Sequence, residues 1–255
     1  MTYSTPDRLF SLAGKVAMVT GGSRGLGAEM VRAFAAAGAD VVIASRRLES
    51  CEELAAEVRR ETGRRALPIA LHAGAWDQAA DVVDAVLREM GGIDVLVNNA
   101  GMSPVYPDLA SITEELWQKV FDVNLRGPFR LSQLVAPTMV ERGGGSIVNI
   151  GTAAVFKPRD YLLPYAAAKS GVLSITEAMA HAYGPTVRVN AIIPGRFFSD
   201  ISKHWDMDEI AVEVQQFAAR RGGEVDEIVG AALYLASGAS SYTTGAQLRV
   251  DGGYA

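Results

Sequence analysis

Short apolar runs alternate with longer amphipathic segments along the whole chain. The runs are rich in valine, isoleucine and leucine, and polar or turn-forming residues bound them. This alternation predicts a parallel sheet that is covered by helices on both faces. Strands are expected at residues 16–20, 41–45, 66–71, 95–98, 146–150, 187–192 and 247–250. Helices are expected at residues 25–37, 48–62, 77–90, 113–140, 164–182, 208–220 and 224–236.

The pattern predicts one α/β domain over residues 1–255, Rossmann-type and doubly wound, with a mainly parallel seven-stranded sheet. No linker, repeat or low-complexity stretch divides the chain. Gly38 and Gly63 follow helical runs and are expected in the left-handed conformation. Gly127-Pro128 interrupts the longest helical run, so a kink is expected just after Asn124. The irregular segment 194–207 begins a substrate-binding loop or lid that is expected to reach residue 221.

Composition narrows the possible partners. The chain has a formal net charge of −5, which opposes broad attraction to nucleic acid or anionic lipid. Cys51 is the single cysteine, and the histidines at 72, 181 and 204 show no metal-ligand spacing, so neither a disulfide nor a metal is expected. No run approaches the roughly 18 apolar residues that a membrane span needs. We therefore expect a cytoplasmic protein with a small-molecule partner.

A glycine-rich loop joins the first expected strand to a helix. Its sequence, from Thr20, is Thr-Gly-Gly-Ser-Arg-Gly-Leu-Gly. Such a loop lets the backbone turn sharply and approach a diphosphate at the helix N-terminus. The alternative is a plain glycine-rich turn, which the position after strand one disfavours. The candidate cofactor contacts in this loop are Gly21, Ser23, Arg24, Gly25, Leu26 and Gly27.

The end of the second strand indicates which nicotinamide cofactor fits. Folds that bind NAD place an acid there for the ribose 2′-hydroxyl, whereas folds that bind NADP place a cation for the 2′-phosphate. Ser45 stands where the acid would be, and Arg46 follows it. Guanidinium geometry suits phosphate, so Arg46, with Arg24 and Ser45, predicts NADP(H) rather than NAD(H). Arg47 is interpreted as a solvated charge at a helix start.

Tyr165 and Lys169 stand four residues apart, which places them on one face of the expected helix. This pair alone is weak, because many surface helices carry one. Its neighbours are the glycine loop, Asn98-Asn99-Ala100-Gly101 after the fourth strand, Asn124 before the kink, and Pro194-Gly195 after the sixth strand. Over nearly the whole chain this ordered set resembles the short-chain dehydrogenase/reductase family, and is similar to NADP-dependent members such as 3-oxoacyl-[acyl-carrier-protein] reductases.

The resemblance implies a catalytic tetrad of Asn124, Thr152, Tyr165 and Lys169. Tyr165 would be the general acid in reduction and the base in oxidation, and Lys169 would lower its pKa and hold the nicotinamide ribose. Thr152 would polarise the substrate carbonyl, and the backbone carbonyl of Asn124 would hold a water in a proton path to the lysine. Further implied cofactor contacts are His72, Ala73, Asn99, Ala100, Gly101, Pro194, Gly195 and Ser199; Asn98 either joins them or ties neighbouring strands together.

Three positions depart from the family pattern. Thr152 replaces the usual serine and keeps the hydroxyl donor, but its methyl group stiffens χ1 and narrows the pocket. Ser199 stands where threonine commonly binds the nicotinamide carboxamide. His72-Ala73 stands where an aspartate often faces the adenine, so His72 either contacts the adenine or is structural.

Together these features predict an oxidoreductase, a ketoreductase by type, that transfers hydride between NADP(H) and a carbonyl or secondary alcohol. The alternatives are a catalytically silent nicotinamide-binding regulator or scaffold, and an isomerase or epimerase of similar fold. The resemblance implies homodimers or homotetramers formed through the helices that carry Asn124 and Tyr165. An apolar pocket is suggested by Phe156, Tyr161, Leu162, Phe197, Phe198, Trp205 and Met207. Room for an acidic or phosphate-bearing tail is suggested by Lys157, Arg159, Arg196 and His204.

Overall fold

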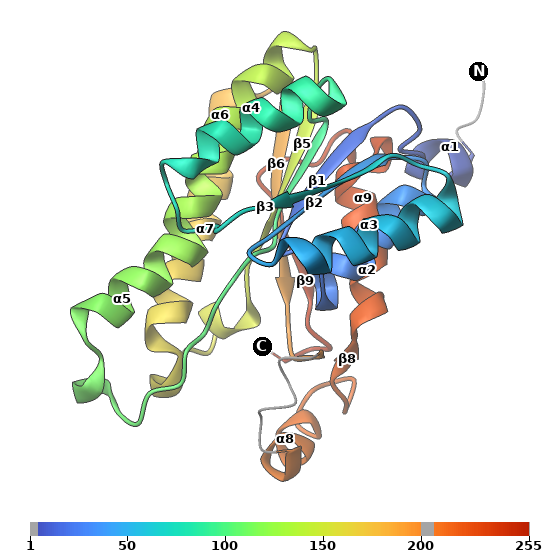
Figure 1. The fold of residues 1–255 in the computed structure, drawn as a ribbon. Coiled ribbons are helices and arrows are strands. Elements are labelled where there is room, and N and C mark those ends of the chain that lie inside the picture. Colours follow the sequence, from blue (N-terminus) through green and yellow to red (C-terminus); the bar gives the residue numbers. More distant parts are fainter. Residues whose placement is uncertain (1–4, 200–206, 255) are drawn as a thin grey trace.

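The computed structural model describes residues 5–199 and 207–254. In these residues, seven parallel strands form one sheet in the order β3-β2-β1-β4-β5-β6-β9 (Figure 1). The strands are β1 (Val16–Thr20), β2 (Asp40–Ser45), β3 (Ala66–Ala70), β4 (Val95–Asn98), β5 (Gly145–Ile150), β6 (Val187–Pro194) and β9 (Gln247–Val250). Each predicted strand is present, and the predicted doubly wound α/β fold is confirmed.

The helices fill the connections between strands. They are α1 (Pro6–Phe10), α2 (Gly25–Ala36), α3 (Leu48–Thr62), α4 (Gln78–Met90), α5 (Glu114–Phe121), α6 (Gly127–Glu141), α7 (Leu163–Tyr183), α8 (Met207–Val214) and α9 (Val229–Ala236). Gly38 and Gly63 have φ values of +98° and +67°, as expected of glycines that end helices.

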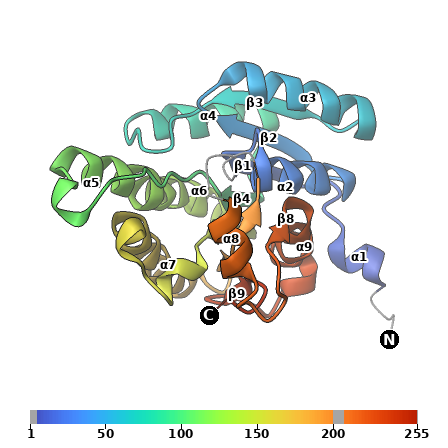
Figure 2. The same cartoon turned by 90° about the horizontal axis from the view of Figure 1, so that it is seen from below.

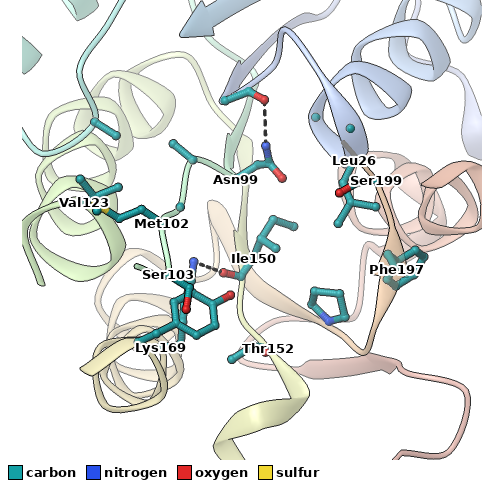
Figure 3. A pocket seen from close by; sticks show the side chains of 18 of the residues that line it. Leu26, Asn99, Met102, Ser103, Val123, Ile150, Thr152, Lys169, Phe197 and Ser199 are labelled. Carbon is teal, nitrogen blue, oxygen red and sulfur yellow. Dashed lines mark hydrogen bonds between the residues drawn. The ribbon is translucent and has the colours of Figure 1, made fainter. Parts of the chain in front are cut away.

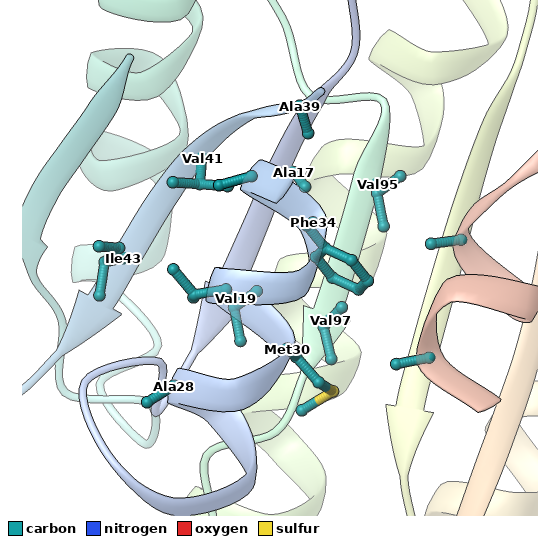
Figure 4. Packing of buried hydrophobic residues seen from close by; sticks show 14 of the residues in the cluster. Ala17, Val19, Ala28, Met30, Phe34, Ala39, Val41, Ile43, Val95 and Val97 are labelled. Carbon is teal, nitrogen blue, oxygen red and sulfur yellow. The ribbon is translucent and has the colours of Figure 1, made fainter. Parts of the chain in front are cut away.

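Helices cover both faces of the sheet (Figure 2). On one face α2, α3 and α9 pack through an apolar cluster that includes Phe34, Leu54 and Leu235. Figure 4 shows Met30 and Phe34 of α2 lying against Val19, Val95 and Val97 of the strands. On the other face α4, α6 and α7 form a second cluster. Burial of the inner strands between two helical layers explains why they are nearly continuous apolar runs, whereas the edge strands β3 and β9 are partly exposed.

A polar network crosses the second face of the sheet. Asn98 of β4 donates from Nδ2 to Asn149 Oδ1 of β5 (2.8 Å) and to Ser132 Oγ of α6 (2.9 Å). Asn149 in turn donates to Thr176 Oγ1 of α7. Asn98 is almost fully buried and does not line the large pocket described below. Of its two expected roles, the structure therefore favours tying strands and helices together.

The predicted kink lies where a π-helical turn, η2 (Asp122–Arg126), joins α5 to α6. Pro128 stands in the first turn of α6, directly after the π-turn, and its ring nitrogen has no hydrogen to donate to the preceding turn. Gly127 is required by close packing, since a Cβ there would lie 1.9 Å from the carbonyl oxygen of Ala73. The single helix expected over 113–140 is therefore two helices with a π-turn between them.

The C-terminal quarter differs most from the prediction. The helix expected over 208–220 ends at Val214, because the amides of Ala218 and Ala219 donate to Gly253 and Gly252 instead of continuing the helix. The helix expected over 224–236 begins as a 3₁₀ turn, Val225–Ile228. Helix α1 and the two-stranded sheet of β7 (Phe197–Phe198) and β8 (Gly223–Glu224) were not predicted.

The strand order reverses between β1 and β4, which creates a crevice outside the carboxyl ends of the strands. Figure 1 shows α8 and β8 below the sheet, at this same end. The predicted site residues follow β1, β2, β3, β4, β5 and β6, so the parallel sheet brings the ends of their strands to one edge.

Candidate active site

The glycine loop is shaped by close backbone approaches at the start of α2. A Cβ on Gly27 would lie 2.2 Å from the carbonyl oxygen of Gly21, and Gly21 and Gly25 have φ values of +61° and +53°. No side chain caps α2, and its first turn carries no acid. The first backbone amides of α2 can therefore donate hydrogen bonds to an anion, which the helix dipole also favours.

Asn99 attaches the end of β4 to the glycine loop. Its Nδ2 donates to the carbonyl oxygens of Thr20 (2.9 Å) and Gly21 (3.1 Å), as Figure 3 shows in part. The backbone amides of Asn99 and Ala100 donate to Thr20 Oγ1, each at 3.0 Å. These bonds join the segment after β4 to the segment after β1, the two sides of the crevice where the strand order reverses. Asn99 thus braces the glycine loop, and its predicted contact with the cofactor stays a prediction.

Hydroxyls and guanidiniums meet where β2 ends. Ser23 Oγ donates to Ser45 Oγ at 3.0 Å, and both serines line the pocket with Arg24 and Arg46. Neither arginine has a carboxylate partner in the described part of the chain. Two uncompensated guanidiniums beside two hydroxyls form a site that fits a phosphate group.

One pocket of about 1210 Å³ runs from the glycine loop to α8. It contains every predicted cofactor contact, and the lining includes Gly21, Ser23, Arg24, Gly25, Leu26, Gly27, Ser45, Arg46, His72, Ala73, Asn99, Ala100, Gly101, Tyr165, Lys169, Pro194, Gly195 and Ser199. Thr152 also lines it (Figure 3). A pocket of this size, with apolar walls and many converging polar groups, is typical of a binding site for a cofactor and a small substrate.

Lys169 is buried at the centre of this pocket. Its Nζ donates to the carbonyl oxygen of Ile150 at 2.7 Å (Figure 3) and lies 5.9 Å from the centre of the Tyr165 ring. Burial lowers the pKa of Lys169 to about 8, because a charged ammonium is disfavoured away from water. A buried lysine held on a backbone carbonyl stores a cost in stability, as functional groups commonly do.

That cost predicts the pH dependence of stability. Below about pH 8 Lys169 is protonated in both the folded and the unfolded chain, so the full cost of burying its charge lowers the stability. Between about pH 8 and the ordinary pKa of 10.5, only the unfolded chain keeps the proton. The free energy of unfolding therefore rises with pH over this range. Since one pKa unit is worth about 1.4 kcal/mol, the penalty is roughly 3 kcal/mol. Lys169→Met should lack this rise.

Urea unfolding of parent and Lys169→Met at about pH 7 and about pH 10 measures the difference. We expect the parent to gain about 2–3 kcal/mol relative to the variant over this range. Any difference in stability that does not depend on pH cancels, because each protein is compared with itself at the two pH values. Parallel pH profiles for the two proteins would contradict a depressed pKa for Lys169.

Tyr165 and Thr152 face the same space. Burial raises the pKa of Tyr165, while a hydrogen bond with Thr152 opposes this rise. The sequence predicted that Lys169 would lower this pKa; the rise in the structure is due to burial, and a lowering by Lys169 stays a prediction. Thr152 Oγ1 accepts a hydrogen bond from the amide of Ala154 at 3.3 Å, so its own proton can be donated elsewhere. At neutral pH the phenol is therefore protonated and able to act as an acid.

Asn124 is fully buried in the π-turn and does not line the pocket. Its side chain exchanges hydrogen bonds with both backbone groups of Met102, at 3.1 Å and 2.8 Å, and donates to the carbonyl oxygen of Val120. A Cβ on Gly101 would lie 3.1 Å from Asn124 Oδ1 and 3.8 Å from Lys169 Nζ. Asn124 thus braces the pocket wall beside Lys169, and its role in proton transfer stays a prediction.

The comparisons with known proteins agree with this geometry. A family model described as short chain dehydrogenase matches residues 15–210. The chain belongs to the short-chain dehydrogenase/reductase family. It is thus an oxidoreductase by family, as the ordered motifs predicted.

Three relatives of this short-chain dehydrogenase illustrate the range of the family. The chain is 37% identical over 254 residues to the short chain dehydrogenase/reductase astE of Aspergillus oryzae, covering 97% of each chain. It is 37% identical over 253 residues to gluconate 5-dehydrogenase of Gluconobacter oxydans, covering 98% of each. A gluconate 5-dehydrogenase from Burkholderia cenocepacia, solved in complex with NADP and tartrate, superposes with a TM-score of 0.93 at 34% identity and 98% coverage of both chains.

The structure sorts the residues that suggested a substrate pocket. Tyr161, Leu162 and Phe197 line it, whereas Phe156 and Phe198 do not. Arg196 lines it too, but is paired with Glu213, and Lys157 donates to the carbonyl oxygen of Tyr254. Arg159 lies outside the lining. His204 and Trp205, and the side chain of Met207, lie outside what the structure describes.

Other pocket residues were missed by sequence reasoning. Tyr106 donates to the carbonyl oxygen of Asp160 and accepts from the amide of Leu163 at 2.8 Å, and so anchors the start of the helix that carries Tyr165. Glu213 of α8 and the penultimate residue, Tyr254, also line the pocket. No motif marks these three positions, because they reach the site through long-range folding.

No helix in the described residues is both long and apolar enough to cross a membrane. The same residues contain no cluster of three His, Cys, Asp or Glu side chains that could hold a metal ion.

Proposed function

We propose that this short-chain dehydrogenase transfers hydride between NADP(H) and a carbonyl or secondary alcohol substrate. The observation that carries the proposal is that Tyr165, Thr152 and Lys169 line the same pocket as the glycine loop and the arginines at the end of β2. The NADP in the solved Burkholderia relative supports the choice of cofactor. When bound, the nicotinamide supplies or accepts the hydride.

The residues present fit such a cofactor. A side chain at Gly27 would fill the cradle at the start of α2, and the open amides of that helix suit a diphosphate. Arg24, Arg46 and Ser45 would hold the 2′-phosphate. Lys169 would hold the nicotinamide ribose with Tyr165, and Ser199, whose Cβ lies 3.6 Å from a Cβ built on Gly25, would contact the carboxamide.

In reduction, the carbonyl carbon gains the hydride pair and its oxygen gains a proton from Tyr165. Thr152 donates a hydrogen bond to that oxygen, which stabilises the charge that develops on it. Tyr165 then regains its proton from solvent, along a path beside Lys169. In oxidation the same groups work in reverse, with the phenolate as base. We propose that the protein assembles through the helices that carry Asn124 and Tyr165.

The test is NADPH oxidation by the purified protein over a panel of ketones, and NADP reduction over alcohols. Turnover supports the proposal. Tight cofactor binding without turnover on a broad panel would instead support the regulatory or scaffold alternative, and rearrangement of a substrate without net cofactor oxidation would support an isomerase.

Arg46→Asp should shift cofactor preference from NADPH toward NADH. The change replaces a charge-assisted phosphate contact worth about 1.5–3 kcal/mol with repulsion, so the ratio of kcat/KM for the two cofactors should fall about 10- to 150-fold. Arg60→Asp, which alters an exposed arginine on α3, is the matched control. Equal use of both cofactors by the parent enzyme would refute the role given to Arg46.

A further inference from the structure

Three polar side chains meet in the pocket from separate parts of the chain. Arg196 follows β6, Glu213 belongs to α8, and Tyr161 lies in the 3₁₀ turn Asp160–Leu162 before α7. Arg196 Nη2 donates to Glu213 Oε2 at 2.5 Å, and the two side chains are 20% and 28% exposed. Burial and the charge of Glu213 raise the pKa of Tyr161, while Arg196 lowers it, as expected for neighbours.

The carboxylate of Glu213 can accept more hydrogen bonds than the one that Arg196 donates to it. It can accept about four hydrogen bonds, and its Oε1 accepts none from the described residues. The lining of the same pocket also includes Phe197, Ile210 and Tyr254, and Ile210 lies on the same helix as Glu213. In such surroundings an acceptor is most stable when a ligand donates to it. The bonding partner it favours is therefore a hydroxyl group.

The charges of the pair set the class of ligand. Arg196 and Glu213 carry opposite charges, so this pair by itself does not select for an anionic or a cationic substrate. A substrate carboxylate would meet Glu213 as well as Arg196, so we expect this pair not to favour an acidic tail. The guanidinium of Arg196 is a hydrogen-bond donor and the carboxylate of Glu213 is an acceptor. Side by side, they can bind two neighbouring hydroxyl groups of one substrate molecule.

We propose that Glu213, held in place by Arg196, binds substrate hydroxyls, so that the preferred substrates are uncharged polyhydroxylated ketones and the matching polyols. This inference rests on the proposed function and names the substrate class of the same site. The alternative is a purely structural role, in which the ion pair only holds α8 against the end of β6. That structural role would affect all substrates equally.

Three ketones distinguish these possibilities with NADPH as the reductant: erythrulose, which is neutral and hydroxylated; butanone, which has the same carbon number and no hydroxyl; and levulinate, which carries a carboxylate. The parent should favour erythrulose over butanone in kcat/KM by about ten- to a hundredfold, since hydrogen bonds to a charged group are of that strength. Levulinate should be the poorest of the three.

Glu213→Gln keeps the shape and removes the charge. It should raise KM for erythrulose about tenfold, leave butanone within about twofold, and improve kcat/KM for levulinate about tenfold because the repulsion is gone. Glu227→Gln is the control: it breaks an ion pair of 2.6 Å with Arg221 that lies outside the large pocket. It should change none of the three ratios.

The outcomes are separable. Reduction of butanone as efficient as that of erythrulose in the parent would overturn the hydroxyl proposal and leave the proposed function standing. An equal loss on all three ketones in Glu213→Gln would show that the pair is structural, and would also overturn it. Absence of turnover with every ketone and alcohol would contradict the proposed function, and this inference with it.

Discussion

Replacing Tyr165 with phenylalanine is expected to lower turnover by about 10²–10⁴-fold, the range typical of a positioned general acid, while NADPH affinity changes little. The phenol lines the pocket with Thr152 and Lys169, and burial raises its pKa. An acid is active below its pKa, so this shift extends the range over which the phenol can donate. Reduction should accordingly slow as the pH rises through the raised pKa of Tyr165.

Steady-state kinetics on one good ketone, with NADPH binding measured by fluorescence, check this expectation. Tyr183→Phe removes a phenol hydroxyl from the last turn of the same helix and should behave like the parent. If the Tyr165 variant keeps most of its activity, another group delivers the proton. If it loses cofactor affinity as strongly as turnover, the phenol binds rather than reacts.

The second large effect is expected at Thr152. Thr152→Val keeps the shape and deletes the hydroxyl, so turnover should fall about 10²–10³-fold, because a donor aimed at transition-state charge is worth about 2.7–4 kcal/mol. Thr152→Ser keeps the donor and should stay active, with wider acceptance of bulky ketones, since one methyl group shifts selectivity by about 1–3 kcal/mol. In the structure Thr152 Oγ1 accepts from the amide of Ala154, a bond that does not use the hydroxyl proton.

Kinetics of both variants on a small and a bulky ketone decide the matter. Thr138→Val, on α6, controls for the loss of a threonine hydroxyl elsewhere, where the hydroxyl donates to the carbonyl oxygen of Val135. A valine variant that matches the parent would mean that Thr152 only packs against its neighbours, and the carbonyl site would have to lie elsewhere in the pocket.

Periodicity predicted the strands well because the inner ones are nearly continuous apolar runs buried between two helical layers. It predicted the C-terminal helices poorly. The end of α8 depends on hydrogen bonds from Ala218 and Ala219 to glycines near the C-terminus, and no local pattern records a contact between segments so far apart. The π-turn was located through Gly127-Pro128, but its form depends on packing of Gly127 against Ala73.

By itself, the sequence determined the fold class and the family, and it named residues that line one pocket, whose contacts with the cofactor stay a prediction. Those features are carried by short motifs at strand ends, where local backbone geometry and residue type are sufficient. Only the tertiary structure decided what depends on burial and on distant partners: that Asn98 ties strands together, that Asn124 braces Met102, and that burial raises the pKa of Tyr165. It also paired Arg196 with Glu213, because charges far apart in the sequence meet only when α8 folds against the end of β6.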